Sequence, residues 1–171
     1  MSKNRITKIN LGTLNLKKKK LMEQIKILTS HLNEEGVLRL IMDDQKNKNA
    51  LSEEMMTYLM EELTKASKNH LIRVIVIAAK GDVFSAGHDL KEITLARGDD
   101  QEGELYFKKL FDQCSLLMQF IVNCPKPVIA EISGTATAAG CQLVASCDLA
   151  LASSQAKFAT PGVNLGLFCS T

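Results

Sequence analysis

Two turns rich in glycine and other small residues are the segments of this 171-residue chain that could support chemistry. The first is Ser85 to His88 and the second is Gly134 to Gly140, and each follows an apolar run. A glycine beside a backbone N–H lets a ligand come close, and a helix N-terminus offers unpaired amides. Two amides that converge on one point form an oxyanion hole, which stabilises the charge that develops on a thioester carbonyl oxygen during enolate formation. The alternative is that Gly87 and Gly140 only allow close packing.

Strands and helices alternate around these turns. Residues 26–43 hold two β-prone runs separated by Asn33-Glu34-Glu35-Gly36, which predicts a hairpin. The segment Ile72–Ala79 is a continuous β-branched run, typical of a strand buried in a parallel sheet, and "PVIAEI" and "LALAS" predict two further strands. This order of elements indicates an α/β layered domain, in which ligands bind at the carboxyl ends of the strands.

Helical segments are predicted between these strands. One begins after Ser52, a favourable N-cap, and presents a core-facing stripe at helical spacing that consists of Met55, Met56, Leu59, Met60 and Leu63. Residues 94–104 predict an exposed loop, and residues 105–124 predict a helix that ends before Pro125. The small-residue segment 135–148 predicts another helix, packed close against a neighbouring element.

Composition limits the class of protein. The chain is 46% hydrophobic and 23% charged, which is typical of one globular domain. No apolar run reaches the roughly 20 residues of a membrane-spanning helix, so no membrane partner is expected. The five cysteines are odd in number and form no CxxC pair, so we expect buried thiols in a reducing compartment and no metal site.

Charge is distributed unevenly along the chain. The first 26 residues carry a net charge of +7, which leaves −5 for the rest. An acidic body argues against nucleic acid as a partner, and RNA binding through the lysine-rich leader is the weakest function considered. We expect residues 1–25 to form a basic, flexible leader; the alternative is an organellar transit peptide, although such peptides are usually rich in Arg and Ser. The expected location is the cytoplasm, with the mitochondrion as the alternative.

Four segments resemble, in their order and spacing, the enoyl-CoA hydratase/isomerase family, also called the crotonase superfamily. They are "NKNALS" (47–52), "VFSAGHDLKEI" (83–93), "KPVIAEISGTATAAGCQLVASCDLALAS" (126–153) and "AKFATPGVNLGL" (156–167). Over residues 26–171 the resemblance implies the ClpP/crotonase fold, a spiral of ββα units. It also implies an acyl-coenzyme A thioester as substrate or ligand, no other cofactor, and a homotrimer or hexamer. Complete family members continue beyond Thr171, so we expect a fragment, a splice product or a truncated binder with an exposed apolar edge.

The resemblance implies particular site residues. The oxyanion hole would consist of the backbone N–H groups of His88 and Ala139, supported by the turn residues Ala86, Gly87, Asp89 and Gly140. The coenzyme A tail would be lined by the loop Lys48, Asn49, Ala50 and Leu51. In that loop Lys48 could bind a phosphate as a point charge, and the alternative is an ordinary solvated lysine.

Two departures from the family decide the expected mechanism. The positions that match the two catalytic glutamates hold Gln142 and Gly162, and neither residue can transfer a proton in the useful pH range. Hydration by the family's own mechanism is therefore not expected. Two functions in fatty-acid metabolism remain open: an enzyme that stabilises a thioester enolate with another base, and a non-catalytic acyl-CoA-binding regulator, that is, a pseudoenzyme.

Other residues near the turns could replace the missing glutamates, and none is preferred. The side chain of His88 titrates near neutrality, but its expected role is through its backbone. The loop carboxylates, which are Asp99, Asp100, Glu102 and Glu104, are expected to face water. The thiol of Cys141 is expected to pack beside the second turn.

Overall fold

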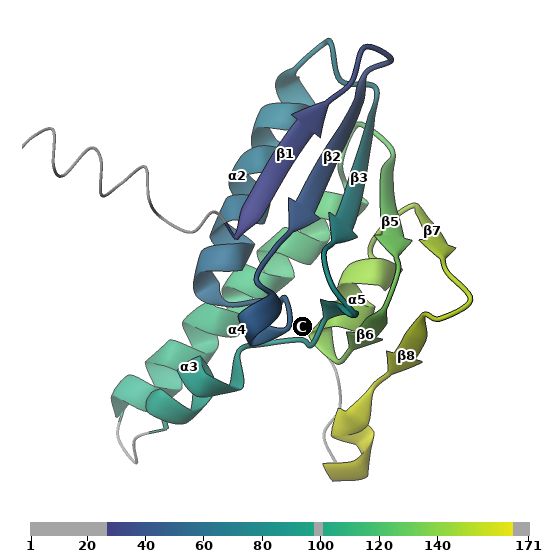
Figure 1. Ribbon diagram of the computed structural model, residues 1–171. Coiled ribbons are helices and arrows are strands. Elements are labelled where there is room, and N and C mark those ends of the chain that lie inside the picture. Colours follow the sequence, from purple (N-terminus) through teal and green to yellow (C-terminus); the bar gives the residue numbers. More distant parts are fainter. Residues whose placement is uncertain (1–26, 98–100, 166–171) are drawn as a thin grey trace, which may run out of the picture.

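The computed structural model describes residues 27–97 and 101–165 (Figure 1). The predicted leader, residues 1–25, therefore lies outside the described residues. Along the chain the elements are β1 (Leu28–Leu32), β2 (Val37–Met42), the 3₁₀ turn η1 (Gln45–Asn47), α2 (Glu53–Lys68), β3 (Val74–Ala79), β4 (Val83–Ser85), α3 (Leu90–Leu95), α4 (Gln101–Val122), β5 (Val128–Ile132), β6 (Thr135–Thr137), α5 (Ala139–Ala145), β7 (Leu149–Ala152), β8 (Lys157–Ala159) and η2 (Pro161–Leu165).

These strands form two sheets. The larger has the order β1-β2-β3-β5-β7, and the smaller has the order β4-β6-β8. Only the β1–β2 pair among them is antiparallel; every other pair of described strands is parallel. From β3 onward each strand of the larger sheet is followed by a strand of the smaller sheet and then by a helical segment. This repeat is the predicted spiral of ββα units, and the α/β fold prediction is confirmed.

The core lies between the larger sheet and two helices. Figure 1 shows α2 and α4 side by side along one face of that sheet. The α2 helix begins after Ser52, whose side chain accepts a hydrogen bond from the Met55 N–H, as predicted. The predicted stripe faces the core: Met55, Met56, Leu59 and Leu63 are fully buried, and Met60 is half-buried.

The hairpin and the three long parallel strands are confirmed. Gly36 closes the β1–β2 turn at φ +83°, a conformation that favours glycine, and the Asn33 side chain accepts hydrogen bonds from the Glu35 and Val37 amides. Strands β3, β5 and β7 lie where the sequence predicts them. The interior residues of β3 are buried, as expected for a central strand, and β3 has a parallel neighbour on each side.

Two predictions about local structure are wrong. Residues 135–148 do not form one helix, because Thr135–Thr137 pairs as strand β6 with both β4 and β8 and the helix α5 begins only at Ala139. Residues 94–104 are not one loop, because α3 continues to Leu95 and α4 begins at Gln101. Acidic residues in the first turn of α4, Glu102 and Glu104, favour a helix N-terminus there.

The thiols are less buried than expected. Cys114 is fully buried, whereas Cys124, Cys141 and Cys147 are half-buried, and none of the four forms a disulfide among the described residues. Cys169 lies outside the described residues. Within the described part of the chain, no helix is long and apolar enough to cross a membrane.

Candidate functional site

The first predicted turn joins β4 to α3. Gly87 has φ +87°, and Asp89 is the N-cap of α3, where its side chain accepts a hydrogen bond from the Lys91 N–H at 2.7 Å. The Leu51 N–H donates to the Gly87 carbonyl at 2.7 Å, in a parallel bridge between Leu51 and His88. Because the carbonyl and the N–H of one trans peptide unit point in opposite directions, the His88 N–H points away from Leu51.

The second predicted turn joins β6 to α5. Ala138 has φ 50° and ψ −125°, which is a strained conformation for a residue with a side chain. Its N–H donates to the Ala159 carbonyl at 2.9 Å, and its carbonyl accepts from the amides of Cys141 and Gln142. Ala139 is the first residue of α5, so its N–H has no acceptor within the helix.

The structure brings the two turns together at Gly87. A Cβ atom added to Gly87 would lie 3.2 Å from the Ala139 nitrogen and 2.9 Å from the Ala138 Cβ. The Thr137 hydroxyl donates to the Ala86 carbonyl at 3.1 Å, which joins the same two turns. Gly87 therefore packs directly against the second turn next to the Ala139 amide, where any side chain at position 87 would collide with that turn.

Gly140 has a packing role. A Cβ atom added there would lie 2.5 Å from the Ser85 carbonyl oxygen, so the glycine lets α5 contact β4 directly. This is the packing alternative that the sequence left open for Gly140. For Gly87 the geometry also shows close packing, and access of a ligand to the Ala139 amide stays a prediction.

The His88 side chain packs against α4. Its ring makes an edge-to-face contact with Phe111 of α4, with ring centroids 5.6 Å apart. Its Nδ1 atom is buried and has no hydrogen-bond partner among the described residues. Burial lowers the pKa of the imidazole. The ring is thus a packing group between α4 and the turn, which agrees with a role for His88 through its backbone.

The loop predicted to bind the coenzyme A tail is held by a buried asparagine. The Asn49 side chain accepts from the Asp44 N–H at 2.8 Å and donates to the carbonyls of Lys80 and Val83 at 2.9 and 2.7 Å. The side chains of Ala50 and Leu51 are also buried. Any ligand contact from these three residues would therefore involve their backbone, and their assignment to coenzyme A binding stays a prediction.

Lys48 is the exposed member of this loop. It lines a cavity of about 170 Å³, whose other charged residues are Lys80 and Asp82. Lys80 is neutralised by Asp43 at 2.6 Å, whereas Lys48 makes no ion pair within the part of the chain that the structure describes. Lys48 is therefore the side chain of this cavity with positive charge available for a phosphate.

The residues at the two glutamate positions are half-buried, the Cys141 thiol is directed at the backbone, and the described loop carboxylates are exposed. Gln142 and Gly162 are half-buried, in α5 and η2. The Cys141 sulfur lies 2.9 Å from the Ala136 carbonyl oxygen and 3.3 Å from that of Ala159, so its S–H is directed at the backbone. Glu102 and Glu104 are exposed in α4, and Asp99 and Asp100 lie outside the described residues. Over the described ranges, no group of three or more His, Cys, Asp and Glu side chains could hold a metal ion.

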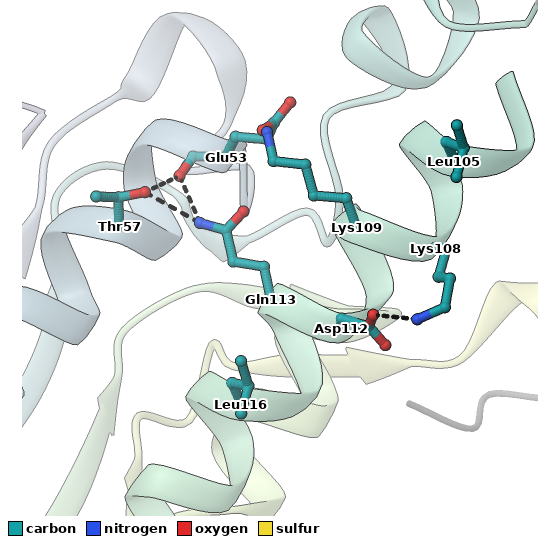
Figure 2. Close-up of a pocket in the computed structure, with 8 residues that line it drawn as sticks. All are labelled: Glu53, Thr57, Leu105, Lys108, Lys109, Asp112, Gln113 and Leu116. Carbon is teal, nitrogen blue, oxygen red and sulfur yellow. Dashed lines mark hydrogen bonds and ion pairs between the residues drawn. The ribbon is translucent and has the colours of Figure 1, made fainter. Parts of the chain in front are cut away.

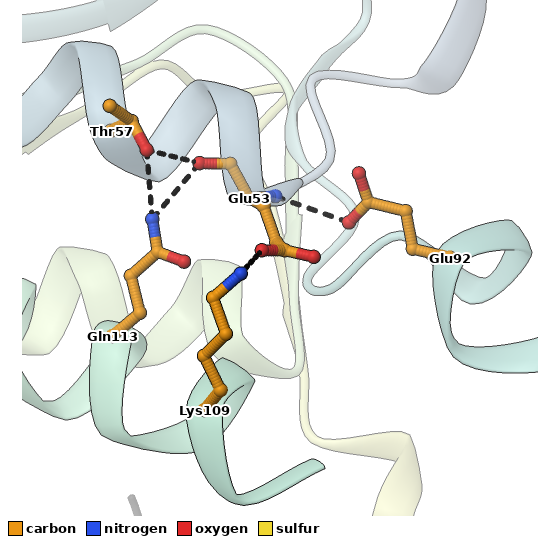
Figure 3. Close-up of polar contacts among 5 residues, drawn as sticks. All are labelled: Glu53, Thr57, Glu92, Lys109 and Gln113. Atoms are coloured by element: carbon orange, nitrogen blue, oxygen red, sulfur yellow. Dashed lines mark hydrogen bonds and ion pairs between the residues drawn. The ribbon is translucent and has the colours of Figure 1, made fainter. Parts of the chain in front are cut away.

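Sequence reasoning missed a polar cluster at the start of α2 (Figure 3). The Glu53 N–H donates to the Glu92 carboxylate of α3 at 3.1 Å, and the Glu53 carboxylate binds Lys109 of α4 at 2.6 Å. Gln113 of α4 donates to the Glu53 carbonyl and to the Thr57 hydroxyl, both at 3.0 Å. The sequence shows Glu53 as a favourable first-turn residue of a helix, but it carries no signal for these partners.

A groove lies between α2 and α4 beside this cluster (Figure 2). It has a volume of about 550 Å³. Its charged side chains are paired, Lys108 with Asp112 at 2.8 Å and Lys109 with Glu53. None of the residues predicted for the site lines it. The groove is therefore separate from the two turns.

Comparison with known proteins gives one consistent family. The model of the enoyl-CoA hydratase/isomerase family matches residues 32–171. The human protein "Enoyl-CoA hydratase domain-containing protein 3, mitochondrial" is 47% identical over 143 residues, which cover 84% of this chain and 46% of that protein. A "Probable enoyl-CoA hydratase" of Bacillus subtilis is 34% identical over 119 residues, which cover 70% of this chain and 44% of that protein.

Solved structures agree with these matches. The crystal structure of the human domain-containing protein 3 superposes with a TM-score of 0.76 at 44% identity, and the match covers 84% of this chain and 55% of that one. An enoyl-CoA hydratase of Mycobacterium smegmatis gives 0.76 at 45% identity, with coverage of 84% and 54%. The quoted segments alone predict similarity to the domain-containing protein 3 group, and the comparisons confirm it. The chain spans about half the length of the relatives that it matches.

Proposed function

Because the chain belongs to the enoyl-CoA hydratase/isomerase family, we propose that it binds acyl-coenzyme A thioesters and holds the thioester carbonyl oxygen with the backbone N–H groups of His88 and Ala139. The observation that carries this proposal is the absence of a side chain at Gly87, where a Cβ would lie 3.2 Å from the Ala139 nitrogen. A carbonyl oxygen can approach this amide for the same reason. No cofactor besides the coenzyme A of the ligand is required.

Two candidate activities follow from this site, and each has its own support. The paired amides support an enzyme that stabilises a thioester enolate, as in isomerisation, decarboxylation or thioester hydrolysis with a base other than the family's glutamates. Gln142 and Gly162 support a non-catalytic binder of acyl-CoA, because neither side chain can move a proton. Hydration by the paired glutamates of the family belongs to neither candidate.

The relatives indicate where in the cell the proposed function would take place. The domain-containing protein 3 relatives are named as mitochondrial proteins, which favours the mitochondrial alternative over the cytoplasmic expectation. We propose a mitochondrial protein of fatty-acid metabolism that assembles as a homotrimer or hexamer.

Calorimetric titration of the 171-residue chain with acetoacetyl-CoA, in parallel with free coenzyme A, tests this function. Both ligands share the nucleotide tail, but only the thioester has a carbonyl oxygen for the two amides. We expect acetoacetyl-CoA to bind at least about tenfold more tightly, because two hydrogen bonds to the thioester carbonyl oxygen contribute about 0.5–1.5 kcal/mol each. Equal affinities, or no binding by the folded chain, would refute the proposed hole. Turnover of a panel of acyl-CoA thioesters then separates the enzyme from the binder.

Replacing Lys48 with glutamine is expected to weaken binding of free coenzyme A by about fivefold, a loss typical of one exposed charge pair. The reason is that Lys48 carries the available positive charge of its cavity. The measurement is the same titration at low and at physiological salt, and the difference between wild type and variant should shrink as salt rises. Lys46→Gln, at an exposed lysine of the same loop, is the matched control. Equal losses in the two variants would mean that only net charge matters.

A further inference from the structure

The turn that carries His88 is held against the loop before α2 by a row of hydrogen bonds. The Ala86 N–H donates to the Lys48 carbonyl at 3.1 Å, and the Leu51 N–H donates to the Gly87 carbonyl at 2.7 Å. The row continues into α3 through two side chains. Lys91 donates to the Asn47 side chain at 2.7 Å, and Glu92 accepts from the Glu53 N–H at 3.1 Å.

The α3 helix has little apolar packing of its own. It spans Leu90–Leu95 and contains no fully buried residue. Leu90 and Leu95 are 72% and 88% exposed, and Ile93 alone of its apolar side chains packs partly against the core. The position of α3 therefore depends on its polar contacts, and Glu92 is the half-buried residue among them, whereas Lys91 is exposed.

The partner of Glu92 is rigidly held. Glu53 is the first residue of α2, and the next residues of that helix, Met55 and Met56, are fully buried. Its carbonyl accepts from Gln113 and its carboxylate binds Lys109, both from α4, as Figure 3 shows. The Glu53 N–H is one of the first-turn donors of α2 that have no acceptor within the helix. Glu92 supplies that acceptor from a different helix.

We infer that Glu92 is a positioning residue of the oxyanion hole: its hydrogen bond to the Glu53 N–H fixes α3, and with α3 the His88 N–H that lies four residues before it. This inference rests on the proposed function. The Gly87 carbonyl and the Glu92 carboxylate are both held by the segment Leu51–Glu53, so the turn between them is fixed at both ends.

The surroundings of Glu92 predict how pH acts on this contact. The titratable groups that face it are Asp89 on its own turn, Glu53 and Glu54 of α2, and Tyr106 of α4. Burial, followed by the repulsion of Asp89 and the two α2 carboxylates, raises the pKa of Glu92, although the Glu53 N–H opposes this change. A carboxyl group with a raised pKa stabilises the folded state most at low pH, and this stabilisation is lost as pH rises through the raised value.

Three variants of the full 171-residue chain test the inference. Glu92→Ala removes the acceptor, Glu92→Gln keeps an acceptor oxygen without the charge, and Glu61→Ala removes an exposed glutamate elsewhere on α2 as a control. The first readout is the hydrogen exchange of the Leu51 and Ala86 amides, relative to that of Ile77 in the central strand β3. The second is the dissociation constant of acetoacetyl-CoA.

We expect Glu92→Ala to accelerate both exchange rates and to weaken acetoacetyl-CoA binding, each by about tenfold, as for the loss of one hydrogen bond. Glu92→Gln and Glu61→Ala should match the wild type in both readouts at neutral pH. The loss of stability of the wild type as pH rises above about 4, near the ordinary pKa of glutamate, should be smaller in Glu92→Gln.

Two results would overturn the inference. One is that Glu92→Ala shows the exchange rates and affinity of the wild type. The other is that Glu92→Gln changes both quantities as much as Glu92→Ala does. If Glu92→Ala does not fold, faster exchange or weaker acetoacetyl-CoA binding in Glu92→Gln would be enough to refute the inference. Faster exchange in Glu92→Ala, together with no acetoacetyl-CoA binding by any chain including the wild type, would support the positioning role and refute the proposed function. The two hypotheses can therefore fail separately.

Discussion

Replacing Gly87 with alanine is expected to weaken acetoacetyl-CoA binding by at least about tenfold, because the two proposed hydrogen bonds to the thioester carbonyl oxygen would be lost. The new methyl group would lie 3.2 Å from the Ala139 nitrogen, where the proposed site would place the carbonyl oxygen. The same substitution forces a side chain onto φ +87°, which costs about 1–2 kcal/mol of stability. Calorimetric titration and thermal unfolding measure the two effects separately.

Gly36→Ala is the matched control for this experiment. Gly36 has φ +83°, and a Cβ there would lie 2.8 Å from the Leu71 carbonyl oxygen, so the strain and the clash are comparable. Gly36 lies in the β1–β2 hairpin, remote from the Ala139 amide. We expect it to lower stability and to leave affinity unchanged. If both variants lose affinity to the same extent, the loss comes from destabilisation and the space beside Ala139 is not a binding site.

Asn49→Ala is expected to lower the free energy of unfolding by about 3–5 kcal/mol. The substitution leaves three backbone groups without their partner, the Asp44 N–H and the carbonyls of Lys80 and Val83. Each buried group without a hydrogen bond costs about 1–3 kcal/mol. Urea unfolding followed by circular dichroism gives the free energy directly.

Asn123→Ala provides the comparison for Asn49. The Asn123 side chain is exposed and donates one hydrogen bond to the Gln119 carbonyl within its own turn, so its loss should cost no more than about 0.5 kcal/mol. A change below about 1 kcal/mol for Asn49→Ala would show that water or a rearranged backbone replaces the lost contacts. Asn49 would then not be what holds the loop of Lys48.

Local signals in the sequence predict much of this fold. Gly36 marks the hairpin, Ser52 marks the start of α2, and the β-branched run before Lys80 marks β3. The three short strands β4, β6 and β8 were not predicted, because three residues carry no measurable periodicity and their partners are distant in the chain. The small residues of Thr135–Thr137 fit a helix as well as a strand, and pairing with β4 and β8 decides between them.

The candidate site is less predictable than the fold. That the turns of Gly87 and Ala139 meet could be inferred only from the resemblance to a family, because nothing local in either segment refers to the other. The contact between Glu53 and Glu92 joins residues 39 positions apart, and two carboxylates would ordinarily be expected to repel each other. The backbone N–H at the start of α2 makes the contact possible, and only the tertiary structure shows it.

The sheet order has a consequence for how the site is assembled. Within each sheet the strands β3, β5 and β7, and likewise β4, β6 and β8, are neighbours in the order in which they are synthesised. A chain growing from its N-terminus can therefore add each new strand to an edge that is already present. In the proposed hole, the His88 N–H belongs to one ββα unit and the Ala139 N–H to the next. On that proposal, ligand binding would report that two successive units have docked, because the two amides come together only after β6 has paired with β4.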